Sequence, residues 1–390
     1  MEKEEITIDG VSTGLQKECT DYELTEPFNP KDIKISQKII SLDQIVSRMK
    51  NGTIRLSPDF QRNEVWDNKK KSLLIESLLL SIPIPMFYVA ADEDGNWDVV
   101  DGLQRLSALR DFIITKTLVL KKLEFWKEYD GKTFDDLSPI LYNRINETQL
   151  YITIIEPNSP PEVKFNIFKR INTGGVGLSS QEIRHALYQG VGTEFLKRMA
   201  NSEAFLKATT RSINDKRMSA REVILRCLSF MIMGTNGYYN NDNMETFLNR
   251  GIQVLNNLQN KERLFSLKVF SEKKIPDLNI KEYEDLEKRF CLSMKRNNLM
   301  FGDNAFRIST QNEKRSPVNK ALFDVWGTVF SEISDEAFNS ILGKKNDFLK
   351  EYDGLKKEEK FYNAVSTTAW QKNNVEYRFY EINKLIGKYI

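Results

Sequence analysis

The chain has 390 residues, of which 40% are hydrophobic and 29% are charged, so it is long enough for two globular domains and is not a short disulfide scaffold. Lys and Arg number 57 and Asp and Glu number 55, and this net charge of +2 neither requires nor excludes a nucleic-acid partner. The charges are unevenly placed, because residues 1–32 hold nine acids and three bases. The remainder of the chain is therefore mildly basic.

Several classes of protein are excluded by what the sequence lacks. No run approaches the roughly 18 apolar residues of a membrane helix, and the first residues do not have the pattern of a secretory signal, so we expect a cytoplasmic protein that does not contact a membrane. The three cysteines show no CxxC spacing, which argues against a disulfide framework or a zinc ribbon. His185 is the one histidine, so a nuclease centre built from several histidines cannot form within this chain.

The predicted elements begin after a polar, acidic leader over residues 1–35, which we expect to be flexible; whether it docks on the rest of the chain stays open. Helical spacing and alternating patterns then follow each other. Helices are expected over 41–50, 69–81 and 103–113, and strands over 53–56, 86–91, 97–100, 118–120 and 151–155. The turn Asp94-Gly95 joins two of these strands as a hairpin.

Beyond about residue 180 the strand patterns fade and helical periodicity continues to the end of the chain. The fold class that this predicts is α+β. A mixed α/β domain over 36–190 is expected to precede an all-helical domain over 191–390.

The first motif that suggests chemistry is Asp101-Gly102-Leu103-Gln104-Arg105, at the junction of a predicted buried strand and a helix. A glycine turn, the free amides of a first helical turn and a guanidinium suit an anion such as phosphate. Asp101 is suited to hold a water molecule bound to magnesium. The alternative is structural, with Asp101 as a helix cap and Gln104 completing a capping box.

The second motif is Pro58-Asp59-Phe60-Gln61-Arg62, followed by Trp66. Gln61 and Arg62 are suited to a base, ribose or phosphate, while the two aromatic side chains are better explained as packing anchors. An arginine beside a buried aromatic residue is also common without any function, so this motif is weak by itself.

The third motif combines a glycine-containing loop with two flanking arginines. Its candidate ligand-binding residues are Arg170, Asn172, Thr173, Gly174, Gly175 and Arg184. Hydroxyl, amide and bare backbone donors allow a ligand to approach closely, but a structural glycine turn is equally compatible with this loop. The helix after it is well specified, because Ser179 and Glu182 have the spacing of a capping box.

Basic residues gather at two places in the predicted helical domain. They are Arg211, Lys216, Arg217, Arg221 and Arg226, and then Lys314, Arg315 and Lys320. Such residues can follow a nucleic-acid phosphate backbone. Because acids are interleaved, a solvated helical face is the alternative, and a helical domain is equally suited to homo-oligomerisation or partner docking.

The blocks PDFQR, LIESLLLSIPIP, VVDGLQRLSAL and FKRINTGGVGLSSQEIRHALY occur in this order over roughly residues 37–190. Together they resemble the N-terminal domain family of GmrSD-type restriction endonucleases, which looks like a branch of the ParB/sulfiredoxin-like superfamily. The family usually has DGQQR where this chain has DGLQR, so Leu103 replaces the first glutamine. Any nucleotide contact that this glutamine makes elsewhere is missing here.

The resemblance implies a domain that binds and hydrolyses a nucleoside triphosphate with Mg²⁺, in bacterial restriction systems directed against phage. Carried onto this sequence, Asp101 orients the metal or water, Gln104 helps to position the attacking water, and Arg105 with Gly102 and the helix start holds phosphate charge. The FQR block, with Gln61 and Arg62, completes the cleft.

By the same resemblance, the RINTGG loop closes the cleft, with Arg170 and Asn172 on the remainder of the ligand. Better-known members join or pair this domain with an HNH nuclease domain, which one histidine cannot build here. We therefore expect an NTPase whose nucleotide state controls contact of the helical domain with DNA, or with a separate nuclease or effector protein. The alternative is a factor without enzymatic activity that binds DNA or assembles a complex and only senses a nucleotide.

Overall fold

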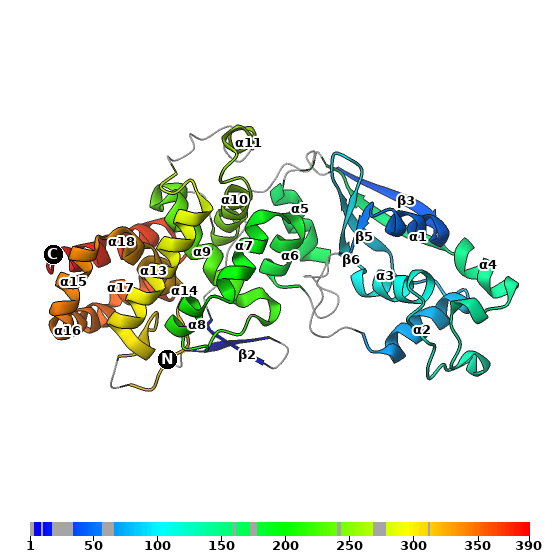
Figure 1. Ribbon diagram of the computed structural model, residues 1–390, viewed down its shortest axis with the longest axis horizontal. Helices are drawn as coiled ribbons and strands as arrows, with labels where there is room; N and C mark the ends of the chain where they lie inside the picture. The colour runs from blue at the N-terminus through cyan, green and yellow to red at the C-terminus, as the bar shows by residue number, and fades with distance from the viewer. Residues whose placement is uncertain are drawn as a thin grey trace. The chain divides into compact units, whose positions relative to one another are not determined.

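The computed structural model describes residues 4–8, 11–17, 34–56, 66–157, 159, 161–171, 178–239, 243–267, 278–310 and 313–390. The chain forms two compact units. We call Phe28–Leu187 the sheet unit, and Met1–Pro27 together with Tyr188–Ile390 the helical unit. The predicted α+β class, with a mixed sheet followed by a helical region, is confirmed (Figure 1).

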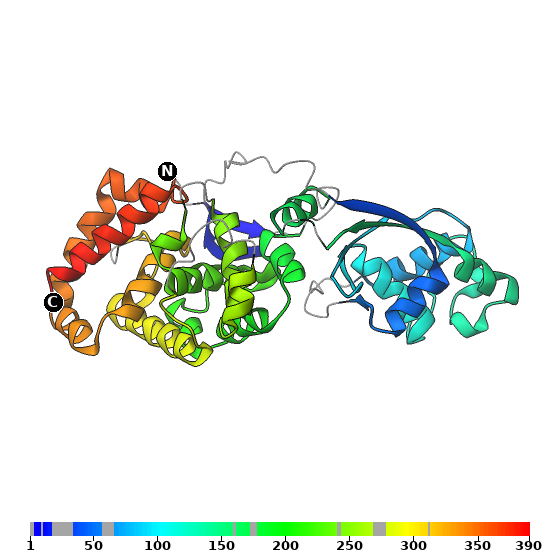
Figure 2. The same cartoon turned by 90° about the horizontal axis from the view of Figure 1, so that it is seen from above.

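The sheet unit is built on a mixed five-stranded sheet. Its strands are β3 (Ile35–Ser41), β4 (Ile54–Arg55), β5 (Phe87–Ala91), β6 (Trp97–Asp101) and β7 (Gln149–Ile155), in the order β3-β7-β5-β6-β4. β5 and β6 form the predicted antiparallel hairpin, whereas β7 pairs in parallel with β5, and β4 with β6. Figure 2 shows β3 and β7 side by side, in agreement with their antiparallel register.

Helices cover both faces of this sheet. They are α1 (Leu42–Lys50), α2 (Asn68–Leu79), α3 (Leu103–Leu109), α4 (Pro139–Glu147), α5 (Pro161–Ile171) and α6 (Ser180–Leu187). The helix that begins with α3 continues as a π-helical turn over Arg110–Ile114.

Alternation along the strands separates two apolar clusters in the sheet unit. On β5, Phe87 and Val89 belong to the cluster that includes residues of α1, α2 and α3, whereas Ala90 belongs to the one that includes residues of α5 and α6. This is the period of two expected of strands buried on both faces. The turn between β6 and α3 lies at the end of one of these buried strands.

The predicted strand over 118–120 is wrong, because the structure has no strand there. Polar side chains of α2 bind the backbone that follows. Ser72 Oγ accepts from the Lys121 amide at 3.0 Å, and the Glu76 carboxylate accepts from the amides of residues 124, 125 and 126 at 2.9, 2.7 and 2.9 Å. Within residues 118–120, the Leu118 amide donates to the Asp111 carbonyl and the Leu120 amide to the Lys132 carbonyl, both at 3.0 Å, so these amides are satisfied without a β ladder.

The helical unit is a bundle around one large apolar core. Its helices include α7 (Val191–Ala200), α8 (Glu203–Ala208), α9 (Ser219–Met233), α10 (Met244–Asn256), α11 (Lys261–Ser266), α13 (Tyr283–Phe301), α14 (Lys320–Glu332), α15 (Asp335–Gly343), α16 (Lys345–Lys357), α17 (Glu359–Val365) and α18 (Lys372–Gly387). Helix α14 is buried along almost its whole length and contributes Trp326 to the centre of the core.

The leader expected over residues 1–35 contains a hairpin in the structure, β1 (Glu5–Ile8) with β2 (Val11–Gln16). The hairpin packs on the helical unit, where the Gln16 amide donates to the Val318 carbonyl and the Val318 amide to the Gly14 carbonyl, both at 2.8 Å. Leu15 is buried in the core of this unit. The acidic composition of residues 1–35 therefore gave no indication of the β1–β2 hairpin, which has an apolar inner face.

Candidate functional site

The turn between β6 and α3 holds the first candidate motif. Gly102 is the N-cap of α3, with φ +98°, and a Cβ built on it would lie 2.3 Å from Cδ1 of Phe87. A side chain is therefore excluded both by the backbone conformation and by the close approach of the ring. The capping alternative is not seen, since α3 has no cap bond from a side chain.

The N-terminal amides of α3 are left without acceptors by this geometry. Within the described part of the chain, nothing accepts from the backbone N–H groups of Leu103, Gln104 and Arg105, while the Leu106 amide donates to the Gly102 carbonyl at 2.8 Å. Free first-turn amides carry the positive end of the helix dipole. They are the part of the motif that remains available to an anion.

Arg105 is committed inside the sheet unit, with 9% of the residue exposed. Its Nη2 donates to Asp101 Oδ2 at 2.7 Å, and its Nη1 donates to the carbonyls of Pro85 and, at 3.2 Å, Met86. The guanidinium also lies over the ring of Phe87, 4.6 Å from its centroid. Burial lowers the pKa of Arg105, and the Asp101 carboxylate opposes this shift.

Asp101 is the more accessible partner of this ion pair, because its side chain is 40% exposed. Oδ2 is held by Arg105, whereas Oδ1 has no hydrogen-bond partner among the residues that the structure describes. The sequence predicts that Arg105 holds phosphate charge. The geometry gives it another task, since it fixes the orientation of the carboxylate.

Gln104 links the turn to the chain just beyond the second motif. Its Oε1 accepts from the Trp66 amide at 3.2 Å, and its Nε2 has no acceptor within the described ranges. The sequence contains a signal for part of this arrangement, because Trp66 follows the PDFQR block closely. The role of the Pro85 and Met86 carbonyls has no such signal.

Several candidate residues cannot be placed. Gln61, Arg62, Asn172, Thr173, Gly174 and Gly175 lie outside the described residues. Arg170 is exposed in the last turn of α5.

Arg184 lies on α6 and is completely buried. Its Nη1 donates to Gln181 Oε1 at 2.6 Å, and its guanidinium lies over Phe165. Phe165 belongs to the apolar cluster opposite the one that contains Phe87. Arg184 therefore contacts the α5 and α6 side of the sheet.

The start of α6 matches the sequence prediction in detail. The Glu182 amide donates to Ser179 Oγ at 3.1 Å, and the Ser179 amide donates to Glu182 Oε2 at 2.6 Å. The predicted capping box is confirmed, so the helix that carries Arg184 begins where the local sequence sets it.

The donor set at the turn limits the metal that it can hold. Within the described ranges, no group of three or more His, Cys, Asp or Glu side chains lies close enough to bind a metal ion. One accessible carboxylate does not make a resident metal cage, but Mg²⁺ is commonly held by one or two carboxylates together with substrate phosphates. The Asp101 side chain therefore fits a magnesium ion that arrives with a nucleotide.

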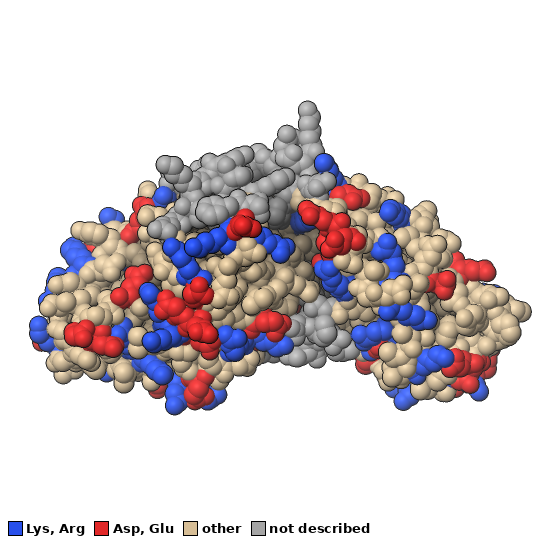
Figure 3. Space-filling view, turned by 45° about the horizontal axis from the view of Figure 1, so that its top comes forward, with Lys and Arg blue, Asp and Glu red and all other residues tan. Residues whose placement is uncertain are grey.

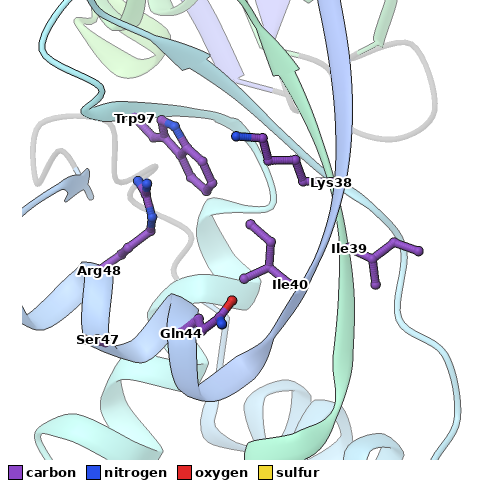
Figure 4. Close-up of a pocket in the computed structure, with 7 residues that line it drawn as sticks. All are labelled: Lys38, Ile39, Ile40, Gln44, Ser47, Arg48 and Trp97. Carbon is purple, nitrogen blue, oxygen red and sulfur yellow. The ribbon is translucent and has the colours of Figure 1, made fainter.

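A hollow of the sheet unit, about 540 Å³ in volume, lies between β3, α1 and β6. Figure 4 shows the side chains of Lys38 and Arg48 directed toward Trp97, and Ile39 directed away. The Arg48 guanidinium lies 4.0 Å from the centroid of the tryptophan ring. Among the described residues, no carboxylate lines this hollow.

The basic residues of the helical unit are mostly paired with acids. Arg211 binds Glu203, Arg221 binds Asp215, Arg226 binds Asp324 and Lys320 binds Glu222, at 2.8, 3.0, 2.8 and 2.7 Å. Figure 3 shows both signs of charge interspersed on the face in view. Arg221, Arg226 and Lys320 are largely buried in their ion pairs, so the prediction that they follow a phosphate backbone is wrong. Arg211 is exposed, and for this residue phosphate contact stays a prediction. Lys314 and Arg315 have no ion pair among the described residues.

The architecture defines a mixed α/β domain with a glycine turn at its candidate site, followed by a helical unit. Residues 42–189 match the family model described as the N-terminal domain of the GmrSD restriction endonuclease, so this region is similar to that domain. The resemblance seen in the motifs is thereby confirmed, and it associates the chain with restriction systems. The search of curated proteins and the search of solved structures found no match. No helix in the described residues is long and apolar enough to cross a membrane.

Proposed function

We propose that the sheet unit binds a nucleoside triphosphate with Mg²⁺ and hydrolyses it, and that nucleotide state controls contact of the helical unit with DNA or a partner protein. The observation that carries the proposal is the β6–α3 turn. There, three helix amides have no acceptor among the described residues, and the Asp101 carboxylate beside them keeps one oxygen free of any described partner. The association with restriction systems, which act on DNA, supports the second part of the proposal.

Each side chain of the turn has a defined task in this proposal. The amides of Leu103, Gln104 and Arg105 bind phosphate oxygens, as amides do at helix N-termini. Asp101 binds the metal or a metal-bound water through Oδ1, while Arg105 holds Oδ2 and acts as a positioning residue. Magnesium, when bound, neutralises charge on the phosphates. The free Nε2 of Gln104 is the donor suited to orient a water or a phosphate oxygen.

A second candidate function is a nucleotide sensor without turnover. The commitment of Arg105 to Asp101, Pro85 and Met86 favours it, because phosphoryl transfer usually relies on a cation that contacts the transferring group. Leu103, in place of the family's glutamine, removes one further polar group from the turn.

The test compares Asp101→Asn with Asp94→Asn, which makes the same change at the exposed turn of the hairpin. Each protein is incubated with each nucleoside triphosphate and Mg²⁺, with and without duplex DNA, and bound nucleotide and released phosphate are both measured. We expect Asp101→Asn to lower phosphate release about a hundredfold or more and Asp94→Asn to leave it unchanged. Asp101→Asn is preferred to replacement of Arg105, whose loss would leave two carbonyls unpaired.

Three results are informative. Phosphate release that depends on Asp101 supports the hydrolase. Binding without release, weakened by Asp101→Asn, supports the sensor. Neither binding nor release in the intact protein overturns both.

A further inference from the structure

A cavity of about 730 Å³ lies in the helical unit, between the N-terminal hairpin and the segment that leads into α14. Three cationic side chains line it, Arg307, Lys314 and Arg315, together with serine hydroxyls such as that of Ser212. Its volume falls within the range of small-molecule sites, about 300–1,000 Å³. The cavity lies wholly in the helical unit, whereas the proposed nucleotide site belongs to the sheet unit.

Arg307 is the buried cation of this cavity, with 3% of the residue exposed. Its guanidinium donates to the carbonyls of Asp303, at 3.1 Å, and Ser316, and to the hydroxyls of Ser212, at 2.8 Å, and Thr210, at 3.3 Å. All four acceptors are uncharged, and no carboxylate within the described part of the chain forms an ion pair with it. The positive charge is therefore held rigidly but is not neutralised.

Arg315 brings a second positive charge to the same place. Its Nη1 donates to Thr210 Oγ1 at 3.3 Å, the hydroxyl that Arg307 also binds. Burial, with the repulsion of Arg315, lowers the pKa of Arg307 to about 10, and this repulsion outweighs the attraction of Asp303 or of Glu5 taken singly. Arg307 still carries its charge at neutral pH. Lys314 adds a third cation beside them.

The acids that line the cavity already have partners. Glu4 forms an ion pair with Lys17 at 2.9 Å. The carboxylate of Glu5 accepts from the Ser12 hydroxyl and, at 2.6 Å, from the Gly14 amide. The lining of the cavity thus holds three cations and two carboxylates, a formal excess of one positive charge.

We propose that this cavity binds a phosphate group, with the exposed side chains of Arg315 and Lys314 as its ligands and the buried guanidinium of Arg307, most of whose donors are committed, as a fixed positive charge behind them. Guanidinium and ammonium groups both bind phosphate oxygens, and the anion offsets the excess positive charge of the lining. The phosphate can belong to a nucleic-acid strand or to a free phosphorylated molecule, since both present the same chemistry.

The test uses the full-length double variant Lys314→Ala/Arg315→Ala. Both side chains are exposed, and the described contacts include one hydrogen bond of Arg315 and none of Lys314, so we expect the variant to fold. The matched control is Lys384→Ala/Lys388→Ala, which removes two exposed cations, each 55% exposed, from α18 and the residue after it. Affinity for a labelled DNA duplex is measured by fluorescence anisotropy over a range of salt concentrations, and affinity for pyrophosphate is measured by calorimetry.

If the phosphate belongs to DNA, the variant at the cavity lowers DNA affinity about tenfold or more and reduces the slope of log affinity against log salt by about 0.9 for each lost contact. If it belongs to a free molecule, only pyrophosphate affinity falls. The affinity of the variant is compared with that of the intact protein, because the proposed nucleotide site of the sheet unit can also bind phosphate groups in both. Arg307→Lys, which keeps the charge but loses the planar fork, provides a second test.

Equal affinities of the intact protein and the double variant for both probes would overturn the proposal, as would an equal loss in the Lys384→Ala/Lys388→Ala control. Phosphate release from nucleotides is measured in parallel and should not change in the cavity variants. Failure of the proposed hydrolysis, which is tested by Asp101→Asn, is thus distinguished from failure of phosphate binding in the cavity, which is tested by Lys314→Ala/Arg315→Ala.

Discussion

At the scale of single residues, the β6–α3 turn depends on the absence of a side chain at Gly102. Two costs are combined there, because φ is +98° and a Cβ would lie within 2.3 Å of the Phe87 ring. Gly131 provides the matched control, since its φ is +82° and nothing lies within 4 Å of a Cβ built on it. The pair therefore separates backbone strain from steric overlap.

We expect Gly131→Ala to lower the free energy of unfolding by about 1 kcal/mol, the cost of a non-glycine residue in the left-handed region. Gly102→Ala should cost about 1–3 kcal/mol more, because Phe87 and its neighbours must shift. Urea unfolding followed by tryptophan fluorescence measures both. Equal losses in the two variants would show that the ring yields without cost and that the turn is looser than the contacts indicate.

At the scale of elements, the segment after α3 is held by one buried carboxylate of α2. Three backbone amides donate to Glu76, and they lower the pKa of this carboxyl although burial by itself raises it. A folded-state pKa below the usual value of 4.5 means that the charged form stabilises the fold above that pH. This stabilisation is lost as the pH falls through the folded-state pKa.

Glu76→Gln should therefore lower the free energy of unfolding by about 1–3 kcal/mol at pH 7, because charge-assisted hydrogen bonds become neutral ones. The difference in free energy of unfolding between intact protein and variant should narrow as the pH is lowered below the usual pKa of glutamate, because the Glu76 carboxyl of the intact protein is then protonated and neutral as well. Urea unfolding at a series of pH values measures this difference. The exposed Glu128→Gln serves as control, and a difference that stays constant with pH would contradict the argument.

Elements whose signals are local could be predicted from the sequence. Apolar spacing and the Asn51-Gly52 stop define α1, and the Asp94-Gly95 turn defines the β5–β6 hairpin. β3 escaped prediction because its partner, β7, is far away along the chain. The β1–β2 hairpin pairs locally, but it lies in an acidic segment whose inner face is buried by contacts with the distant Val318 segment.

The position of the candidate site was also predicted from local sequence patterns. The role of Arg105 was not, because its carbonyl partners are distant in the sequence. The DGLQR motif lies at the predicted strand-to-helix turn. Its arginine, however, binds carbonyls of Pro85 and Met86, which carry no side-chain signal in the sequence. Sequence spacing can locate a turn, but it does not show how many N–H donors of an arginine bind other groups of the protein and are therefore not available to a ligand.

At the scale of the whole molecule, each unit has an apolar core of its own, and the core of the helical unit contains a charged cluster. Asp324 on α14 is 0% exposed, and its carboxylate binds Arg226 of α9 at 2.8 Å and Arg378 of α18 at 3.5 Å. Three helices are thus joined by one buried anion. Such a cluster is a weak source of net stability, but its partial removal is costly, because the remaining charges cannot be hydrated.

Asp324→Asn should lower the free energy of unfolding of the helical unit by about 3–5 kcal/mol, since two buried guanidinium groups lose their shared counter-ion. The control, Glu287→Gln, neutralises the exposed partner of Arg198 and should cost at most about 1 kcal/mol. Hydrogen exchange resolved by peptide measures both, and it assigns the loss to α9, α14 and α18 rather than to the sheet unit. If protection falls equally in the β5–β6 hairpin, the two units unfold together. A nucleotide that stabilises the sheet unit would then also stabilise the helical unit, which is one way to couple nucleotide state to that unit.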